Sequence, residues 1–567
     1  MILNALLKIK GDVLADVELP LAEGELTGLG LSDIRPLDIE TAHRLLPFQP
    51  QEPFQTIFQR KLYCGSTKFF LVTGTWDNLR ALREKVTYFS DIFVWSSTRQ
   101  STKLSTKEIG CHLGLPSADP ARPETKGFAT YIDEGQRQAL LHIVPVYWFL
   151  EYSSHALTAA QSTSQVPKMC DALLALPFSP HLSPLGHKVF GNNSYTTAHF
   201  THGLHQYKGK FFPRMVRSLL NAHRPNLVVD PLCGSGTLQA EAMTSGYPSV
   251  GFDLNPLSIE LCKMKSEILK VNPEELDRLR VQMLAELECP RQLHLLRESQ
   301  EAYGTLATFK SAFPEDLRNK LSPDDVAYIE GALSLTEVLC QEPYRHIFRM
   351  ILSDALKSKV RVRVGGKTQF FYAIEPNTRN IASLFASAAL HAGKLASAWQ
   401  VLRRRLGLAL AKSVTLYGDA RAWPNFDGCP DLIITSPPYF PYTGISYIYT
   451  NLAAMAVLGI RDLRQLERSM IGNIINRSSM SSSRFDRIPE IRELFSFLSG
   501  DKFRRSRIEV YRQYFDDLGR ALEEMNRQCQ PGAQIRFVIA KYQKLYTMKE
   551  KRAVHNINCA GIVSQIG

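Results

Sequence analysis

The chain has 567 residues, of which 44% are apolar and 22% are charged. This is the composition of an ordinary globular protein, and the length suits about two to four domains. No run approaches the ~20 consecutive apolar residues of a membrane span, and the first residues lack the length and flanks of a secretory signal. We therefore expect a cytoplasmic protein with no membrane partner.

The charge and cysteine content narrow the classes of partner and site. Lys and Arg give a formal net charge of +12, which modestly favours a polyanionic partner such as nucleic acid. The 10 cysteines are scattered from Cys64 to Cys559, without a CxxC pair or a Cys/His cluster at ligand spacing. This pattern argues against a zinc site and a disulfide framework, so we expect reduced thiols and no bound metal.

The first 195 residues divide into two parts. Strand-forming runs at 69–73 and 92–95, with a helical pattern at 77–85 between them, predict a small N-terminal α/β domain over residues 1–100. Residues 101–195 are predicted to be a linker and a region of uncertain structure. Segment 96–125 is rich in Ser, Thr, Gly and Pro, 135–149 has a helical pattern, and 177–193 has a loop composition.

From residue 196 the pattern changes to alternating helices and strands. A helix at 212–221, a strand at 227–229, a glycine turn, a helix at 238–245 and a strand at 249–252 form a β-turn-α-β unit. Further strands are expected at 414–416, 432–434 and 535–539, with a helix at 507–529 before the last. These lengths predict an α/β fold with a doubly wound, Rossmann-like parallel sheet. Residues 257–405 are mostly helical in pattern, and alternation around two glycines at 360–371 predicts a hairpin.

The glycine turn and three acids predict a nucleoside-binding edge. Gly234 and Gly236 lack a Cβ and let the backbone approach a ligand closely. Asp253 ends the second strand of the unit, where an acid can accept hydrogen bonds from a ribose diol. Asp230 ends the first strand, and Asp419, after the strand at 414–416, can hold an adenine amino group. A single Asp is more often a turn or cap residue, but the conjunction is stronger, and the absence of G-x-G-x-x-G argues against NAD.

A second turn, Ser436-Pro437-Pro438-Tyr439, follows the buried strand at 432–434. An exocyclic base amine is a poor nucleophile because its lone pair is delocalised into the ring. The Ser436 oxygen and the Pro437 carbonyl can accept its hydrogens, and the prolines fix the turn. The ring of Tyr439 offers a surface on which an extruded base can stack. Taken alone, the turn is merely a proline-rich strand exit.

These segments resemble the S-adenosylmethionine-dependent amino-methyltransferases of DNA, of the N4-cytosine and N6-adenine type. Asp230-Pro231-Leu232-Cys233-Gly234-Ser235-Gly236-Thr237 looks like the family's cofactor motif. Two further segments, Asp253-Leu254-Asn255 and Gly418-Asp419-Ala420, look like the next motifs. Residues 202–213 are similar to the segment that closes over the methionine moiety. The resemblance implies cofactor contacts by Lys210, Phe211, Asp230, Cys233, Gly234, Gly236, Thr237, Asp253, Asn255 and Asp419, and catalysis by Ser436, Pro437, Pro438 and Tyr439.

The resemblance covers about residues 196–260 and 410–545, and it implies a catalytic domain made of 196–260 and 406–567. The family's second and third motifs usually lie much closer together than Asp253 and Asp419 do here. The mostly helical insertion at 261–405 is therefore a candidate target-recognition region, and the N-terminal domain is an equal candidate. Basic stretches at 357–367, 461–507 and 541–552 are candidate phosphate contacts, or solvated surface.

The resemblance implies methylation of a flipped base in double-stranded DNA, with S-adenosylmethionine as the donor. Ser436 at the first position of the tetrad favours cytosine N4 over adenine N6. A role in restriction–modification or phage defence follows, with cognate restriction or defence proteins as partners. Two alternatives stay open: a methyltransferase of RNA base amines (tRNA or rRNA), and a DNA-binding subunit that retains the fold without activity.

Overall fold

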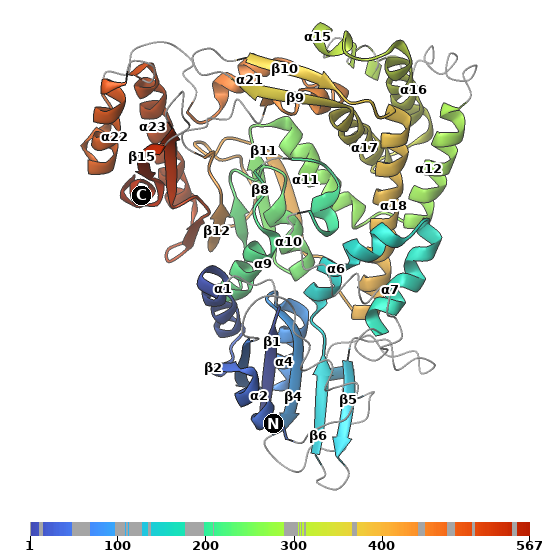
Figure 1. Ribbon diagram of the computed structural model, residues 1–567, viewed down its shortest axis with the longest axis vertical. Coiled ribbons are helices and arrows are strands. Elements are labelled where there is room, and N and C mark those ends of the chain that lie inside the picture. The colour runs from blue at the N-terminus through green and yellow to red at the C-terminus, as the bar shows by residue number, and fades with distance from the viewer. Residues whose placement is uncertain are drawn as a thin grey trace.

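The computed structural model arranges the chain around two large sheets (Figure 1). The structure describes residues 2–10, 15–47, 68–96, 108, 111–112, 128–133, 138–175, 198–207, 209–288, 304–305, 307, 309–310, 313–365, 371–439, 448–472, 482–501, 505–546 and 553–566. The predicted loop at 177–193 and most of the predicted linker at 96–125 lie outside these residues.

The N-terminal part forms a six-stranded antiparallel sheet, seen at the bottom of Figure 1, in the order β2-β3-β1-β4-β6-β5. Side chains alternate across it: Leu7 packs into one face, and Leu6 and Phe93 into the other. The predicted strands at 69–73 and 92–95 and the helix between them are confirmed. The elements are β1 (Leu3–Ile9), α1 (Ala15–Gly28), β2 (Ser32–Asp38), α2 (Ile39–Leu45), β3 (Lys68–Gly74), α4 (Trp76–Lys85), β4 (Phe89–Ser96), β5 (Phe128–Asp133) and β6 (Gln138–Ile143).

The prediction of a helical piece at 135–149 is wrong in its first half. Strand β6 occupies Gln138–Ile143, and helix α6 (Val146–Ala159) begins only after it. A short apolar run such as the one around Leu140 and Leu141 fits a buried strand or a buried helix equally well by periodicity. Residues 138–143 form a strand because they pair with β4 on one side and β5 on the other. Residues beyond the predicted boundary at 100 therefore complete the N-terminal sheet.

A five-stranded parallel sheet occupies the centre of the molecule, in the order β11-β8-β7-β12-β13. All five predicted strands are confirmed, as β7 (Val228–Asp230), β8 (Ser249–Asp253), β11 (Ser413–Tyr417), β12 (Leu432–Thr435) and β13 (Gln534–Phe537). The order of strands along the chain reverses between β7 and β12. In open parallel sheets, ligands bind beyond the carboxyl ends of the strands at such a reversal.

Helices cover the central sheet through alternating side chains of its strands. Val228 and Ile434 pack with α9 (Pro213–His223) and α10 (Thr237–Ser245), whereas Val229 and Ile433 pack with α23 (Ile508–Gln528). The predicted helices at 212–221, 238–245 and 507–529 are thereby confirmed. Helix α11 (Pro256–Ile268) follows β8 and places Cys262 against Cys233 of the glycine turn.

Between α11 and β11 the chain is mostly helical, as predicted, and contributes to one large core together with α6. Its elements are α12 (Pro273–Leu287), α15 (Glu315–Arg318), α16 (Pro323–Leu339), α17 (Tyr344–Lys359), β9 (Val360–Gly365), β10 (Phe371–Pro376) and α18 (Ile381–Leu406). Strands β9 and β10 form the predicted hairpin, whose tip at 366–370 lies outside the described residues.

The remaining elements are α7 (Val166–Ala175), α20 (Leu452–Val457), α21 (Leu463–Ser469), α22 (Pro489–Gly500), β14 (Tyr542–Tyr546), β15 (Ala553–Asn558) and α24 (Cys559–Ile566), with 3-10 turns at Thr163–Gln165, Phe200–Gly203, Arg484–Arg487 and Arg505–Arg507. The C-terminal hairpin of β14 and β15 and the helix α24 were not predicted. Across the described residues, no helix combines the length and the apolar character that a membrane crossing requires.

The N-terminal sheet is joined to the central sheet by a buried polar contact between α1 and α9. Glu25 accepts hydrogen bonds from the Asn221 amide at 2.6 Å and the Thr87 hydroxyl at 3.0 Å. Burial raises the pKa of the Glu25 carboxyl to about 7. Nearby, α1 and α9 approach so closely that a Cβ on Gly28 would lie 2.3 Å from the carbonyl oxygen of Ala222. Only glycine fits at this position.

This close approach predicts opposite effects for two glycines of α1. We expect Gly28→Ala to lower the free energy of unfolding by about 1–3 kcal/mol, because the added methyl group forces the helices apart. Gly24 has no atom within 4 Å of an added Cβ, so Gly24→Ala should be neutral or stabilising by up to ~1 kcal/mol. Chemical denaturation of the two variants checks this, and equal stabilities would contradict the packing described here.

Candidate active site

The glycine turn and the Ser-Pro-Pro-Tyr turn meet because β7 and β12 are neighbouring strands. Leu432 pairs with Val228 and Ile433 with Val229, so the two strands end side by side. The hydroxyl of Thr435, the last residue of β12, donates a hydrogen bond of 2.7 Å to Oδ1 of Asp230. Both groups are buried. The glycine turn and the Ser-Pro-Pro-Tyr turn, about 200 residues apart in sequence, therefore each follow one residue of this hydrogen-bonded pair.

A hollow opens above these two strand ends and contains both turns. Its empty space is about 770 Å³, including the open solvent at its mouth. It is lined by the predicted residues Gly234, Asp253, Asn255, Asp419, Ser436, Pro437, Pro438 and Tyr439, and also by Tyr207, Gly209, Leu232, Leu254, Gly418, Ala420, Met470 and Ile471. The structure therefore brings together eight of the fourteen predicted residues at one surface.

The glycine turn uses both glycines, but for different reasons. Gly234 and Gly236 have positive φ angles of 49° and 72°, which L side chains rarely adopt. A Cβ on Gly236 would lie 2.5 Å from the Sγ of Cys262, so this position also needs the space. The amide of Gly234 donates to Oδ2 of Asp253 at 2.9 Å. This amide therefore orients the Asp253 carboxylate at the end of β8.

Of the two acids at the ends of β7 and β8, Asp230 is buried and Asp253 is half-buried. Burial raises the pKa of the Asp230 carboxyl to about 7, because desolvation outweighs the hydrogen bonds from Thr435 and the Leu232 amide. Burial also raises the pKa of Asp253, which accepts backbone hydrogen bonds from Gly234 and Asn255. Perturbed carboxyls of this kind at a hollow are typical of binding sites.

Unsatisfied polar atoms beside the hollow fit a polar ligand. Among the described residues, the Asn255 Nδ2 and the Asp230 Oδ2 are buried without a hydrogen-bond partner. Asn255 also lines the hollow, where its amide can donate to a ligand while its Oδ1 caps α11. Buried polar groups are rarely left unpaired without a reason. The Asn255 amide as a donor, with the Asp230 and Asp253 carboxylates as acceptors, suits a ligand that carries both hydroxyl and amino groups.

Asp419 lines the hollow, yet its carboxylate is already bound by a neighbour in sequence. The Arg421 guanidinium donates to Oδ2 at 2.7 Å and to Oδ1 at 3.0 Å. The Arg421 amide adds a third bond to Oδ1 at 2.9 Å. The predicted contact of Asp419 with an adenine amino group stays a prediction, since only part of the carboxylate is left for it.

The Ser-Pro-Pro-Tyr turn is fixed from the side of α23. The hydroxyl of Tyr514, a buried residue, donates a hydrogen bond of 2.8 Å to the carbonyl oxygen of Pro438. Tyr514 also lines a second, smaller hollow that shares Pro438 and Tyr439 with the first. The other walls of this second hollow include Phe515, Gln543 and Cys559. Pro438 and Tyr439 therefore lie between the two hollows, whereas Ser436 and Pro437 line only the first.

Six predicted residues lie behind the surface of the hollow: Lys210, Phe211, Asp230, Cys233, Gly236 and Thr237. The Lys210 ammonium points into the interior, where it donates to the carbonyls of His202 at 2.6 Å and His205 at 2.9 Å. Burial lowers the pKa of Lys210 to about 8. Phe211 belongs to the core between α9 and the sheet. These residues support the hollow in this structure, and their predicted contacts with a cofactor remain predictions.

Other lining residues were missed because they carry no recognisable signal. Tyr207 and Gly209 belong to the basic segment singled out above, and the Tyr207 hydroxyl lies 3.1 Å from that of Ser258. Their positions three residues and one residue before Lys210 were the available clue. Met470 and Ile471 follow a short polar helix, and nothing in their own sequence marks them.

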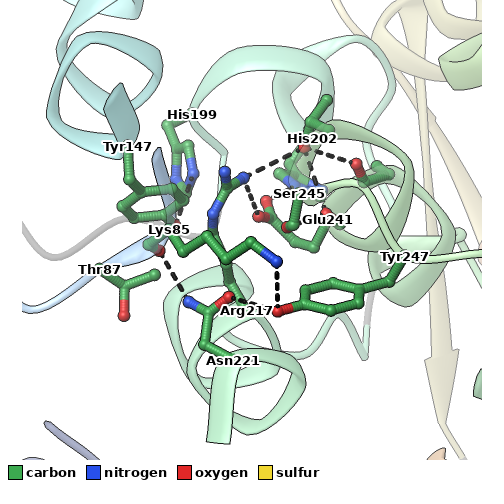
Figure 2. Close-up of polar contacts among 12 residues, drawn as sticks. Lys85, Thr87, Tyr147, His199, His202, Arg217, Asn221, Glu241, Ser245 and Tyr247 are labelled. Atoms are coloured by element: carbon green, nitrogen blue, oxygen red, sulfur yellow. Dashed lines mark hydrogen bonds and ion pairs between the residues drawn. The ribbon is translucent and has the colours of Figure 1, made fainter. Parts of the chain in front are cut away.

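A buried cluster of two histidines and an acid resembles a metal-ligand set. Within the described residues, ligand atoms of His199, His202 and Glu241 lie within 4.8 Å of one another. Glu241 contacts His202 at 2.8 Å and the Arg217 guanidinium at 3.3 Å, and Figure 2 shows both side chains facing it. Among the described contacts, the Tyr147 hydroxyl lies 3.2 Å from His199, and Nζ of Lys265 lies 3.4 Å from His202. The cluster is therefore a buried hydrogen-bonded network between the two sheets, and its cations oppose a metal ion.

Comparison with known proteins finds two distant relatives. Over 85 residues, which are 15% of this chain and 16% of the relative, the sequence is 34% identical to the Type II methyltransferase M.MjaII of Methanocaldococcus jannaschii. Over 392 residues, which are 59% of this chain and 73% of the relative, it is 25% identical to the Type II methyltransferase M.BsoBI of Geobacillus stearothermophilus. No protein-family model matches the chain, and no solved structure matches it. The chain thus spans only a small part of the first relative and about three quarters of the second.

The raised pKa of Asp230 predicts a pH-dependent stability. The folded chain binds this proton more tightly than the unfolded chain, whose Asp pKa is near 3.8. Stability should therefore fall as the pH rises from about 4 to about 7, by at most on the order of 4 kcal/mol. Asp230→Asn keeps the acceptor for Thr435 and removes the titration, so its stability should fall less over this range.

Denaturant unfolding at pH 5 and pH 8 measures this difference. Asp324→Asn, at an exposed position of α16, is the matched control and should behave like the unaltered chain. Parallel pH dependences for the unaltered chain and Asp230→Asn would show that Asp230 does not titrate as described.

Proposed function

We propose that this protein is an S-adenosylmethionine-dependent DNA methyltransferase that acts on the exocyclic amine of a flipped base, with N4 of cytosine as the favoured target. The observation that carries the proposal is that the glycine turn, Asp253, Asp419 and the Ser436–Tyr439 turn line one hollow. The two relatives named Type II methyltransferases support methyl transfer. On this proposal the central sheet is the doubly wound, Rossmann-like sheet of such an enzyme.

S-adenosylmethionine would supply an electrophilic methyl group, and the residues of the hollow suit its polar parts. Asp253 has an acceptor for ribose hydroxyls, and Asn255 has a free buried amide hydrogen among the described contacts. Asp230 can accept from an ammonium group directly or through water, since its Oδ2 has no partner among the described residues. A negative Asp230 would pair best with an ammonium group, so cofactor affinity should rise with pH toward and above 7.

The catalytic step needs acceptors for the hydrogens of the base amine. The Ser436 oxygen and the Pro437 carbonyl are the proposed acceptors, and they let the lone pair localise toward the methyl donor. Tyr514 holds the neighbouring Pro438 carbonyl, so the turn is already fixed before a base enters. The Tyr439 ring would stack on the base.

The choice of base and of nucleic acid rests on the first residue of the tetrad. Ser436 favours cytosine N4, and DNA adenine N6 is the alternative that keeps the same mechanism. An RNA base amino-methyltransferase is the second candidate function, and a DNA-binding subunit without activity is the third. The intact turns with their hydrogen-bonded support argue against the third.

The wider arrangement is part of the proposal. Residues 196–260 and 406–567 would form the catalytic domain, with residues 261–405 or the N-terminal domain reading the DNA target. Double-stranded DNA would be the partner, and restriction–modification or phage defence in the cytoplasm the setting. A cognate restriction or defence protein would then exist.

Labelled S-adenosylmethionine tests the proposal when it is incubated with the full chain, mixed genomic DNA and total RNA. Nucleoside mass spectrometry then identifies the product. N4-methylcytosine in DNA is the expected result, and N6-methyladenine would keep the mechanism but change the base. Label found only in RNA would replace DNA by RNA as the substrate, and no label in either would argue for the inactive subunit.

The proposed acceptor role predicts the phenotype of Ser436→Ala. Loss of the hydroxyl should reduce methyl transfer by about 100-fold or more, while cofactor affinity stays near normal because the Ser436 side chain is assigned to the base. Asp253→Ala should show the opposite pattern, with weakened cofactor binding. Calorimetric titration with the cofactor and single-turnover methyl transfer separate the two effects. Full activity of Ser436→Ala would remove Ser436 from the mechanism.

The support from α23 predicts a smaller effect for Tyr514→Phe. This change keeps the ring and removes only the hydroxyl bound to Pro438, so we expect methyl transfer to fall about tenfold, the worth of one net hydrogen bond in positioning. Tyr511→Phe is the control, since Tyr511 is equally buried on the same helix and lines neither hollow. Equal rates for the two variants would show that the hydroxyl does not position the turn.

A further inference from the structure

The Arg421 guanidinium joins three separate segments beside the cofactor hollow. Arg421 follows β11 by four residues, and its side chain is only 17% exposed. Besides its two bonds to Asp419, Nη2 donates to the carbonyl of Ser469 at 2.6 Å, and Nη1 pairs with Asp517 at 3.0 Å. Ser469 ends α21 and Asp517 lies in α23. A single planar cation thus uses most of its donor positions on fixed partners.

Asp517 completes the arrangement from the other side. Its side chain is 1% exposed, and its Oδ2 accepts a hydrogen bond of 3.0 Å from the amide of Gly472. Residues 469–472, here called the wall segment, are therefore held at one end by Arg421 and at the other by Asp517. The two holding groups form an ion pair with each other. Loss of either one would leave a poorly paired buried charge, which is costly.

The wall segment contributes directly to the hollow. Met470 and Ile471, its two middle residues, line the hollow together with Gly418, Asp419 and Ala420. The backbone of the segment is a turn, with Gly472 at φ 80°. The glycine amide and the Ser469 carbonyl are backbone groups, so the two bonds fix the path of the chain and not only a side chain. The position of Met470 and Ile471 thus depends on the Arg421–Asp517 pair.

We propose that Arg421 is a positioning residue for the cofactor, which holds the wall segment in place as one side of the hollow. Asp419 is its anchor: the carboxylate orients the guanidinium toward Ser469 and Asp517. This assignment gives Asp419 a second task beside the contact with adenine predicted above. The inference rests on the proposed function, because it explains how that cofactor site is closed on the side of α21.

Calorimetric titration of S-adenosylmethionine into the full-length chain tests the inference. Arg421→Gln should weaken binding about tenfold, the loss expected for one charge-assisted hydrogen bond. Arg421→Lys, which keeps the charge but not the fork geometry, should lie between Arg421→Gln and the unaltered chain. The control is Arg527→Gln on α23, whose Arg is 69% exposed and, among the described residues, pairs with Glu524 of the same helix. It should bind normally.

Two further readouts separate positioning from general stability. With saturating cofactor, Arg421→Gln should recover a kcat within about threefold of the unaltered chain, so the defect appears in KM. Asp517→Asn should weaken binding similarly, and the double variant should be little worse than either single one, because both release the same segment. A loss of kcat in proportion to the folded fraction, with unchanged KM, would overturn the inference.

The outcomes distinguish this inference from the proposed function. If the unaltered chain binds S-adenosylmethionine and folded Arg421→Gln binds it equally well, the positioning role is wrong and the proposed function stands. If Arg421→Gln does not fold, normal affinities of Arg421→Lys and Asp517→Asn would overturn the role in the same way. If the unaltered chain does not bind the cofactor at all, both the proposed function and this inference are wrong.

Discussion

The hydrogen bond between Thr435 and Asp230 is the interaction on which the site depends. Both residues end central strands, and the register of β7 and β12 makes their side chains neighbours. Each turn begins immediately afterwards, so the bond fixes the starting points of the glycine turn and of the Ser436–Tyr439 turn relative to each other. Because the pair is buried, water does not compete for it. Two segments that are distant in sequence are therefore held at fixed positions relative to each other by this one hydrogen bond.

Helix α23 supports both halves of this site from one face. Tyr514 and Asp517 are three residues apart, which places them on the same side of a helix. Tyr514 binds the Pro438 carbonyl, and Asp517 binds Arg421 and the wall segment. The same helix also packs its apolar side chains Ala521 and Met525 on the sheet. Its docking on the sheet thus sets the position of the Ser436–Tyr439 turn and of one wall of the hollow together.

The central sheet and the meeting of the two turns at one of its edges could be predicted, because their signals are local. Apolar runs that end in Asp230, Asp253 or Ser436 mark strand ends, and strand ends of a parallel sheet gather at one edge. The strand β6 was mistaken for a helix because a short apolar run has no decisive period, and its partner strands decide its conformation. Arg421, Tyr514 and Met470 could not be assigned, because their importance lies in contacts with residues far along the chain. Lys210 shows the opposite case. The segment 202–213 that contains it was recognised in the sequence, but its ammonium donates to backbone carbonyls of that same segment.

A crystal structure of the full chain with S-adenosylhomocysteine, the product form of the proposed cofactor, tests the central claim most directly. The account predicts density for the ligand between the glycine turn and Ser436, with the ribose at Asp253 and the sulfur facing the tetrad. It also predicts an unchanged Thr435–Asp230 contact beneath the ligand. Density elsewhere, or a ligand that leaves the hollow between the two turns empty, would contradict the claim that they form one active site.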